Sequence, residues 1–179
     1  MRKVTFGVAN SLDNYIARKN DAVDWLMWSK EASVIMTKYW KRIDTVVMGR
    51  KTYDVSLRMN KGKANPYPGM KPYVFSRTLP RAGKQGVEIV GTDAVKFVRK
   101  LKKAKGKEIC VMGGGELAKS LFEAKLIDEV GFNIHPVLLG SGIRLFHEMK
   151  RPINLELRDC QRFKNGCVFV LYRVKYGGS

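Results

Sequence analysis

Short apolar runs alternate with amphipathic stretches along the first two thirds of the chain. Five apolar runs are predicted strands: residues 4–9, 44–48, 73–75, 87–90 and 108–112. Four stretches are predicted helices: residues 30–41, a segment that starts at Arg50, a segment after Asp93, and residues 116–124. A polar loop with Trp25 and Trp28 separates the first strand from the first helix.

The last third of the chain has the alternation of strands instead. Val130, Phe132 and Ile134 alternate with other residues, Leu155 and Leu157 follow, and residues 167–174 are one apolar run. These segments predict adjacent antiparallel strands. The whole pattern predicts a three-layer α/β fold, with helices on both faces of a mixed, mostly parallel central sheet and an antiparallel C-terminal hairpin. A chain of 179 residues without an internal repeat is predicted to form one domain, residues 1–179.

The charge balance is strongly basic, with 34 Lys and Arg against 16 Asp and Glu, a net charge of +18. Such a balance is typical of proteins with phosphate-rich partners, including nucleic acids. In the helix after Asp93, one side is apolar and the other carries most of the cations: Lys96, Arg99, Lys100, Lys102, Lys103 and Lys105. We interpret this side as a solvated face, because no DNA- or RNA-binding motif accompanies it; nucleic-acid binding stays the alternative.

Three cysteines, Cys110, Cys160 and Cys167, form no CxxC pair and have no spacing that suits zinc. We expect them to be buried, reduced thiols and predict no metal site. The sequence lacks a secretory signal at its start, and no apolar run approaches the roughly 20 residues that span a bilayer. A cytoplasmic protein without membrane contact is expected.

Two strand-to-helix turns carry candidate chemistry. In VVMGRKT, residues 46–52, a helix begins with unpaired N–H groups beside two cations, an arrangement that attracts phosphate. In ICVMGGGELAKSLF, residues 109–122, three glycines let the backbone approach a ligand closely. Each turn alone is more often a simple tight turn. A standard Rossmann site is disfavoured, because the glycines come late and Asp128 follows them too closely to bind the ribose.

Taken together, the segments are specific. ANSLDNYIA, VDWL, GRKTYD, YVFSRT, GGGELAKSLFEAKLIDEV and IHPVLLGSGIRLF occur in an order and spacing that resembles the dihydrofolate reductase superfamily. They are most similar to the C-terminal reductase domain of the bifunctional riboflavin-biosynthesis deaminase/reductase and its stand-alone bacterial relatives. The resemblance covers residues 4–172. It implies a dihydrofolate-reductase-like fold, a small-molecule substrate and a homodimer.

The resemblance also implies NADPH as the cofactor, with these positions. The backbone groups that bind the nicotinamide carboxamide correspond to Ala9 and Ile16. The turn that holds the pyrophosphate and reaches the adenosine 2′-phosphate corresponds to Gly49, Arg50, Lys51 and Thr52, and the rest of the 2′-phosphate site to Ser76, Arg77 and Thr78. The turn against the diphosphate and nicotinamide corresponds to Gly113, Gly114, Gly115, Glu116 and Leu117. Two arginines and a hydroxyl suit a phosphomonoester, which favours NADPH over NADH.

Features specific to folate enzymes are missing. Ser33 stands where those enzymes carry the carboxylate that protonates the pterin, and Glu31 is two residues away. Met70 replaces the arginine that pairs with the glutamate tail of folate, and Asn133 replaces the threonine that supports the acid. We therefore expect a substrate other than dihydrofolate, either pterin-like or ribosylaminopyrimidine-like.

The residues that would complete the chemistry stay open. Proton donors could be Asp24, Glu31, His135 or bound water, and no catalytic residue is assigned. Trp25, Trp28 and Tyr53 could stack on a flat substrate, although core packing is expected for at least two of them. The leading hypothesis is an NADPH-dependent oxidoreductase. The alternative is a non-catalytic protein that uses the same scaffold and its basic surface to bind nucleotides or nucleic acid.

Overall fold

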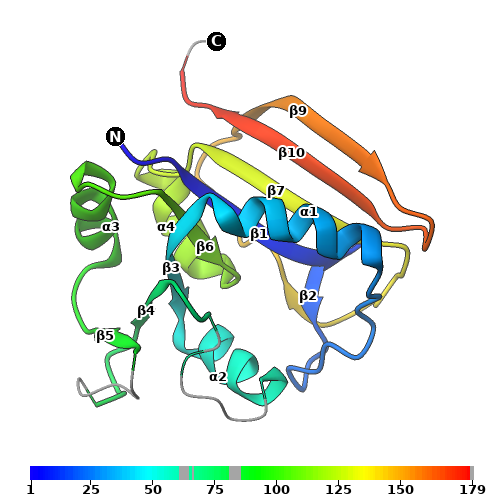
Figure 1. Ribbon diagram of the computed structural model, residues 1–179, viewed down its shortest axis with the longest axis horizontal. Helices are drawn as coiled ribbons and strands as arrows, with labels where there is room; N and C mark the ends of the chain where they lie inside the picture. Colours follow the sequence, from blue (N-terminus) through cyan, green and yellow to red (C-terminus); the bar gives the residue numbers. More distant parts are fainter. Residues whose placement is uncertain (61–64, 66, 81–85, 178–179) are drawn as a thin grey trace.

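The computed structural model describes residues 1–60, 65, 67–80 and 86–177 (Figure 1). Its helices are α1 (Lys30–Lys41), α2 (Arg50–Met59), α3 (Ala94–Lys103) and α4 (Gly115–Glu123). Its strands are β1 (Val4–Ser11), β2 (Tyr15–Ala17), β3 (Ile43–Gly49), β4 (Lys71–Phe75), β5 (Glu88–Val90), β6 (Glu108–Met112), β7 (Glu129–His135), β8 (Ile143–Arg144), β9 (Asn154–Arg162) and β10 (Val168–Lys175).

One eight-stranded sheet runs through the molecule in the order β5-β4-β3-β6-β1-β7-β10-β9. The strands from β5 to β7 pair in parallel, whereas β10 pairs antiparallel with β7 and with β9. A mixed, mostly parallel sheet with an antiparallel C-terminal hairpin is what the sequence predicts, and this prediction is confirmed. A separate ribbon of two short strands, β2 and β8, lies beside the sheet.

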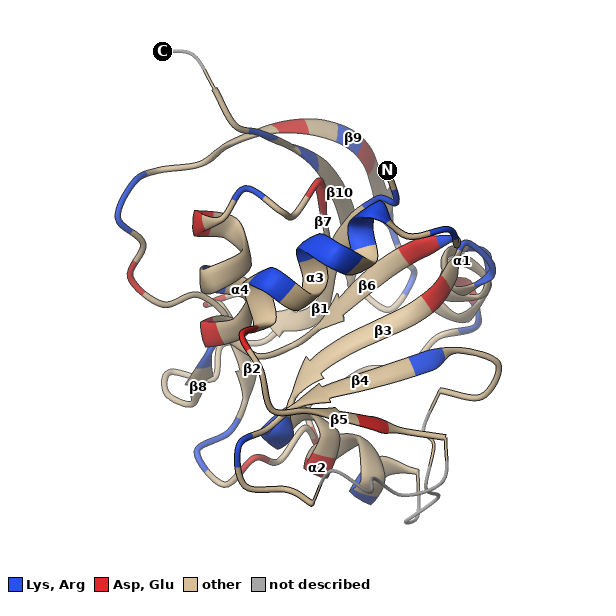
Figure 2. Cartoon of the chain, turned by 90° about the vertical axis from the view of Figure 1, so that its left-hand side faces the viewer, with Lys and Arg blue, Asp and Glu red and all other residues tan. Residues whose placement is uncertain are grey.

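Helices cover both faces of the sheet (Figures 1 and 2). Adjacent residues of β3 show why: Val46 packs into the apolar cluster that includes Tyr53 of α2, whereas Val47 packs into the cluster that includes Val98 of α3 and Leu121 of α4. Because side chains alternate along a strand, a run that is apolar throughout supplies two cores at once.

The predicted solvated face of α3 needs one correction. Lys102 is only 8% exposed; its Nζ donates to the Leu126 carbonyl at 3.1 Å and forms an ion pair with Asp128. The reason is helical geometry, because Lys102 follows Val98 by four residues and so lies on the apolar stripe. The other cations that the pattern placed outside are exposed: Lys96, Arg99, Lys100, Lys103 and Lys105.

The expectation for the cysteines is also partly wrong. Cys110 and Cys167 are buried free thiols, but Cys160 is exposed. Cys160 lies on β9, the edge strand, where one side of the backbone has no neighbouring strand and most side chains are exposed. Within the described residues, no helix is long and apolar enough to cross a membrane.

Candidate functional site

Three of the predicted ligand-binding turns meet at one edge of the sheet. The strands before them are neighbours in parallel register, with Met48 beside Met112 and Gly49 beside Phe75. The helix after β3 covers one face of the sheet and the helix after β6 covers the other. Such a point, where the connections leave in opposite directions, opens a crevice beyond the carboxyl ends of the strands, and open α/β sheets bind ligands there.

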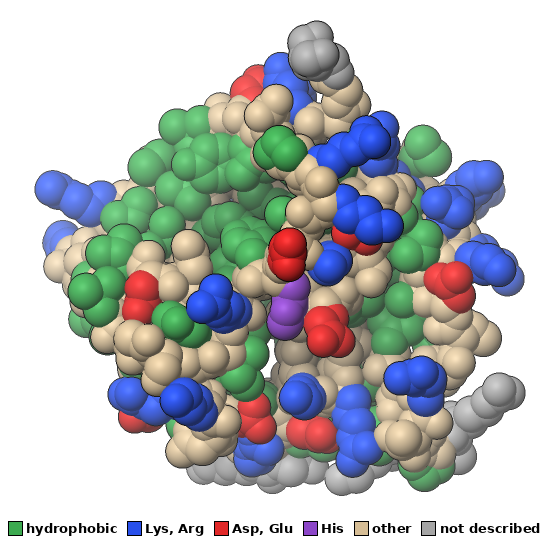
Figure 3. Space-filling model, turned by 180° about the vertical axis from the view of Figure 1, so that it is seen from behind, with side chains coloured by type: hydrophobic (Ala, Val, Ile, Leu, Met, Phe, Trp, Pro, Cys, Tyr) green, Lys and Arg blue, Asp and Glu red, His purple; other side chains and the backbone are tan. Residues whose placement is uncertain are grey.

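The surface shows this crevice. In Figure 3 a groove descends from the middle of the molecule, in the region that Figure 1 shows between α2 and β2. Its floor is formed largely by backbone and uncharged polar side chains, and charged side chains of both signs stand along its rims. A floor with few charged side chains lets a ligand approach the backbone, and helix N-termini bind anions through their backbone N–H groups.

The turn at Gly49 is open to a ligand. Gly49 is the N-cap residue of α2, in extended backbone, and no side chain caps the helix. A Cβ built on Gly49 would have no atom of the described residues within 4 Å. Gly49 therefore leaves room for a ligand at the start of α2, where the partial positive charge of the helix favours an anion. Lys51 of the same turn is exposed, and Thr52 is partly buried.

Arg50 is held in place from two sides. Its Nη1 donates to Thr78 Oγ1 at 2.7 Å, and its Nε lies 3.5 Å from Asp54 Oδ2, one helical turn further along α2. These contacts join the turn after β3 to the turn after β4. Sequence reasoning missed Asp54, although an arginine followed four residues later by an aspartate is the signal of such a helical pair.

The turn after β4 is organised by Ser76. Its hydroxyl oxygen accepts hydrogen bonds from the backbone N–H groups of Thr78 at 3.2 Å and Leu79 at 3.0 Å. Ser76 was expected to contact the ligand, and the structure adds a role in shaping the turn. Arg77 and Thr78 are exposed at its tip. Arg77 and Arg50 thus belong to two turns that the Arg50–Thr78 hydrogen bond holds together.

The three glycines after β6 differ in what they face. Gly113 and Gly114 have positive φ angles of 52° and 74°, a conformation that favours glycine. A Cβ on Gly113 would lie 3.0 Å from Thr52 Oγ1, and one on Gly115 would lie 2.7 Å from the Leu145 carbonyl oxygen. A Cβ on Gly114 would meet only atoms at 3.8 Å. Protein packing therefore requires Gly113 and Gly115, whereas Gly114 has room for a ligand.

The remaining predicted cofactor positions lie around the same edge. Glu116 is exposed in the first turn of α4, and Leu117 packs against the core on the side of α4. Ala9 is near the end of β1, with Asn133 of β7 as its register partner. Ile16 lies in β2, which pairs with β8. All the predicted cofactor residues thus belong to strand ends, turns and the small ribbon at this side of the fold.

The candidate proton donors are not brought together. The carboxylate of Asp24 is exposed and accepts from Arg18 Nε at 2.7 Å. Glu31 accepts from the Lys164 backbone N–H at 2.9 Å. His135 is 1% exposed. Asp24 and Glu31 are thus each held in a contact of their own, and His135 is buried.

Of the aromatic candidates, two are buried, as expected. Trp25 and Tyr53 are core residues. Trp28 is 76% exposed and therefore remains available to stack on a ligand.

Comparison with known proteins agrees with this geometry. The sequence matches the RibD C-terminal domain over residues 2–169. The chain belongs to the RibD C-terminal domain family. YyaP of Bacillus subtilis (strain 168) is 32% identical over 180 residues, which cover 96% of this chain and 94% of YyaP.

Solved structures confirm the fold. A riboflavin biosynthesis protein from Shewanella sp. PV-4 superimposes with a TM-score of 0.81 at 26% identity, covering 98% of this chain and all of that one. Dihydrofolate reductase from Enterococcus faecalis, solved with NADP(H), superimposes with a TM-score of 0.67 at 18% identity, covering 97% of both chains. The dihydrofolate-reductase-like fold of this RibD C-terminal domain protein is thereby established.

His135, the last residue of β7, has a structural role. Its Nδ1 accepts from the Met27 backbone N–H at 3.1 Å, Trp25 packs edge-on against its ring, and Asn133 Nδ2 lies 3.2 Å from Nε2. Burial lowers the pKa of His135, so the neutral ring carries its proton on Nε2. The side-chain amide of Asn133 is the hydrogen-bonding neighbour of Nε2. His135 fastens the Trp25–Met27 segment to β7.

Two alanine variants separate ligand contact from packing. Gly115→Ala should lower the free energy of unfolding by about 1–3 kcal/mol, because the methyl group overlaps the Leu145 carbonyl. Gly49→Ala should leave stability within about 0.5 kcal/mol, because its methyl group enters open space, but should weaken binding of the expected dinucleotide. Urea unfolding and ligand titration measure both. A large loss of stability in Gly49→Ala would contradict the open turn.

The buried imidazole predicts a pH dependence of stability. Because the pKa of His135 lies below the 6.5 of a free side chain, the unfolded chain binds the proton more readily than the native protein. The contribution of His135 to the free energy of unfolding should therefore be largest above about pH 6.5 and fall as the pH drops below it, by at most about 1.4 kcal/mol per pH unit. His135→Gln should remove this slope, whereas the control His147→Gln, at an exposed histidine, should keep it. Equal slopes in both variants would exclude His135 as the source.

Proposed function

We propose that this protein is an NADPH-dependent reductase that transfers a hydride to a small heterocyclic substrate, pterin-like or ribosylaminopyrimidine-like. One observation carries the proposal. The GRKT, SRT and GGG turns lie side by side at the carboxyl edge of the sheet, and the backbone is open at Gly49 and Gly114. Membership of the RibD C-terminal domain family supports it, together with the superposition on a riboflavin biosynthesis protein and on a dihydrofolate reductase.

The residues fit the parts of NADPH. The uncapped N-terminus of α2 and the open Gly114 suit a diphosphate, which needs backbone donors and close approach. Arg50, Arg77 and Thr78 form a cationic corner with a hydroxyl, which suits the 2′-phosphate that distinguishes NADPH from NADH. We assign the nicotinamide to the last residues of β1, which include Ala9 and lie near the β2–β8 ribbon.

The chain supplies position and environment for the reaction, and the bound nicotinamide supplies the hydride. The ion pair with Asp54 and the hydrogen bond to Thr78 orient Arg50 before any ligand binds. Asp24, Glu31 and His135 each make a contact within the protein, so bound water is the proposed proton donor. His135 and Asn133 keep the Trp25–Met27 segment in one position beside the end of β7.

Dihydrofolate is not the proposed substrate. Ser33, at the position of the folate enzymes' acid, is exposed, and its hydroxyl donates to the Ser29 carbonyl at 3.0 Å. It therefore cannot hold a proton for a pterin ring as a carboxylate would. Met70 packs against the core cluster that contains Tyr53 and offers no charge to a glutamate tail.

The test is titration with NADPH and NADH. NADPH should bind more tightly, and Arg77→Ala should weaken NADPH binding about 10–100-fold while leaving NADH binding nearly unchanged, because a charge-assisted contact to the 2′-phosphate is lost. Arg58→Ala is the control, since Arg58 is an exposed arginine at the far end of α2. Failure of the wild-type protein to bind either dinucleotide would reject the reductase and favour the non-catalytic alternative.

The protein is further proposed to be a homodimer that pairs through the open part of its sheet. On the α4 side of β9 and β10, Leu155 and Leu157 are exposed next to Val174 and Tyr172. Figure 3 shows a broad hydrophobic area where Figure 1 has these strands. An apolar surface of this kind is self-complementary, which suits a two-fold interface. The three free thiols are compatible with the cytosol as its compartment.

A single charge should separate the two copies. Leu157→Glu places a carboxylate at a leucine that is 55% exposed, so the fold tolerates it but an apolar interface does not. Size-exclusion chromatography with light scattering should show a dimer for the wild-type protein and a monomer for this variant. Leu138→Glu is the control at another exposed leucine, and it should remain dimeric. A monomeric wild-type protein would refute the pairing.

A further inference from the structure

The outward side of α3 forms a continuous cationic ridge. The α3 ridge consists of Lys96, Arg99, Lys100 and Lys103. These residues are three and four positions apart, so they share one side of the helix, and all four are exposed. Figure 2 shows Lys and Arg along α3 with no acidic residue on the helix. With a rise of 1.5 Å per residue, the ridge is roughly 10 Å long.

The charges of the α3 ridge are not neutralised within the protein. In the part of the chain that the structure describes, no carboxylate oxygen lies within 4.0 Å of a ridge nitrogen. Other cations are paired, such as Lys3 with Glu129 and Arg42 with Glu108. On the same helix, Lys102 turns inward to Asp128. The ridge therefore keeps its full charge for an outside partner.

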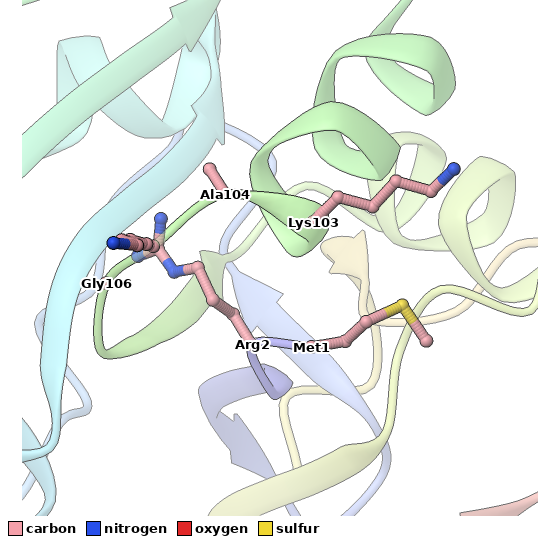
Figure 4. Close-up of a pocket in the computed structure, with 6 residues that line it drawn as sticks. Met1, Arg2, Lys103, Ala104 and Gly106 are labelled. Carbon is pink, nitrogen blue, oxygen red and sulfur yellow. The ribbon is translucent and has the colours of Figure 1, made fainter.

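The cationic surface continues beyond the end of the helix. An open hollow of about 690 Å³ lies there, lined by Met1, Arg2, Lys103, Ala104, Lys105 and Gly106. Figure 4 shows Lys103 extending away from the ribbon, whereas Arg2 points back toward Gly106. The guanidinium of Arg2 is occupied by Asp44 and Thr45. The free charge at this end therefore comes from Lys103 and Lys105.

The ridge offers charge and little else. The apolar side of α3 is used up by the core, since Val98 is fully buried and Phe97 packs edge-on against Tyr73 and Phe75. None of the exposed large hydrophobic residues lies on α3. A membrane-surface helix needs a free apolar face, and a protein interface needs buried anchor residues. Neither is present on the ridge.

We propose that the α3 ridge binds the phosphate backbone of a nucleic-acid duplex. A duplex carries about one negative charge per 1.7 Å of its axis, so a short row of unpaired cations meets several phosphates and releases their counterions. The ridge has no aromatic side chain to stack on single-stranded bases and no amide to read base edges. Binding is therefore independent of sequence. The lack of a recognition motif argues against base reading, not against backbone contact.

This surface is separate from the proposed reductase site. The ridge residues belong to α3, and the GRKT, SRT and GGG turns contain none of them. The helix runs from the site's edge of the sheet, where the Ser76 N–H bonds to the Val90 carbonyl, to the opposite edge at Arg2. Dinucleotide binding and duplex binding can therefore be lost independently.

The experiment compares two variants with equal loss of charge. The ridge variant is Lys96→Gln, Arg99→Gln, Lys100→Gln and Lys103→Gln. The control variant changes four exposed lysines, three of them on α1 on the other face of the sheet: Lys30, Lys38, Lys41 and Lys150, each to Gln. Fluorescence anisotropy measures the binding of a short labelled DNA duplex of mixed sequence, from about 50 to about 200 mM salt. Thermal unfolding and NADPH titration accompany each variant.

The wild-type protein should bind the duplex with a slope of about −4 in the logarithm of affinity against that of salt, as four phosphate contacts predict. The ridge variant should lose at least about tenfold in affinity and most of the slope, and the control variant less than about threefold. Equal losses in both variants would mean diffuse attraction by net charge and overturn the proposal. The proposal would also be overturned if the wild-type protein bound anionic vesicles but not the duplex. The ridge variant should bind NADPH as tightly as the wild-type protein does. A loss of duplex binding can then be told apart from a failure of the proposed reductase function.

Discussion

The hydrogen-bonded pairing of β3 with β6 is the constraint on which the site depends. It sets Met48 beside Met112, so β3 and β6 end next to each other at the same edge of the sheet. The chain then continues into α2 on one face of the sheet and into α4 on the other. The two helix starts then touch, with Thr52 packed against Gly113. A side chain at Gly113 would push the turns apart. The crevice is therefore a consequence of strand order and of one missing Cβ.

Around this crevice, residues with similar sequence signals have different tasks. Gly49 and Gly114 leave space, whereas Gly115 lets the Leu145 carbonyl approach. Ser76 shapes its turn, and Asp54 orients Arg50. The anion binding that we propose for the site rests on backbone donors together with one oriented arginine, Arg50.

Positive charge is used in two ways in this molecule. At the turn after β3, Arg50 is held by Thr78 and Asp54, which limits the entropy lost when a phosphate binds. Along α3, flexible lysines and one arginine stand unpaired on the outer side of the helix and can adjust to successive phosphates of a duplex. The first arrangement suits a defined small ligand and the second a long one. The same excess of charge in the composition therefore serves two proposed partners of different size.

The sequence by itself determined the helices and the strands of the main sheet in chain order, the mixed sheet and the family, because apolar periodicity and the GRKT, SRT and GGG turns are local patterns. It did not predict the short strands β2 and β8. It contained the signals for Lys102, which follows the core residue Val98 by four positions, and for Asp54, which follows its ion-pair partner Arg50 by four positions. Only the tertiary structure decided that Glu31 caps the Lys164 N–H and that His135 holds Met27. Those partners lie more than 100 residues apart, and the order of strands in the sheet brings them together. The exposure of Cys160 was decided in the same way, because a strand's own residues do not show that it will lie at the edge.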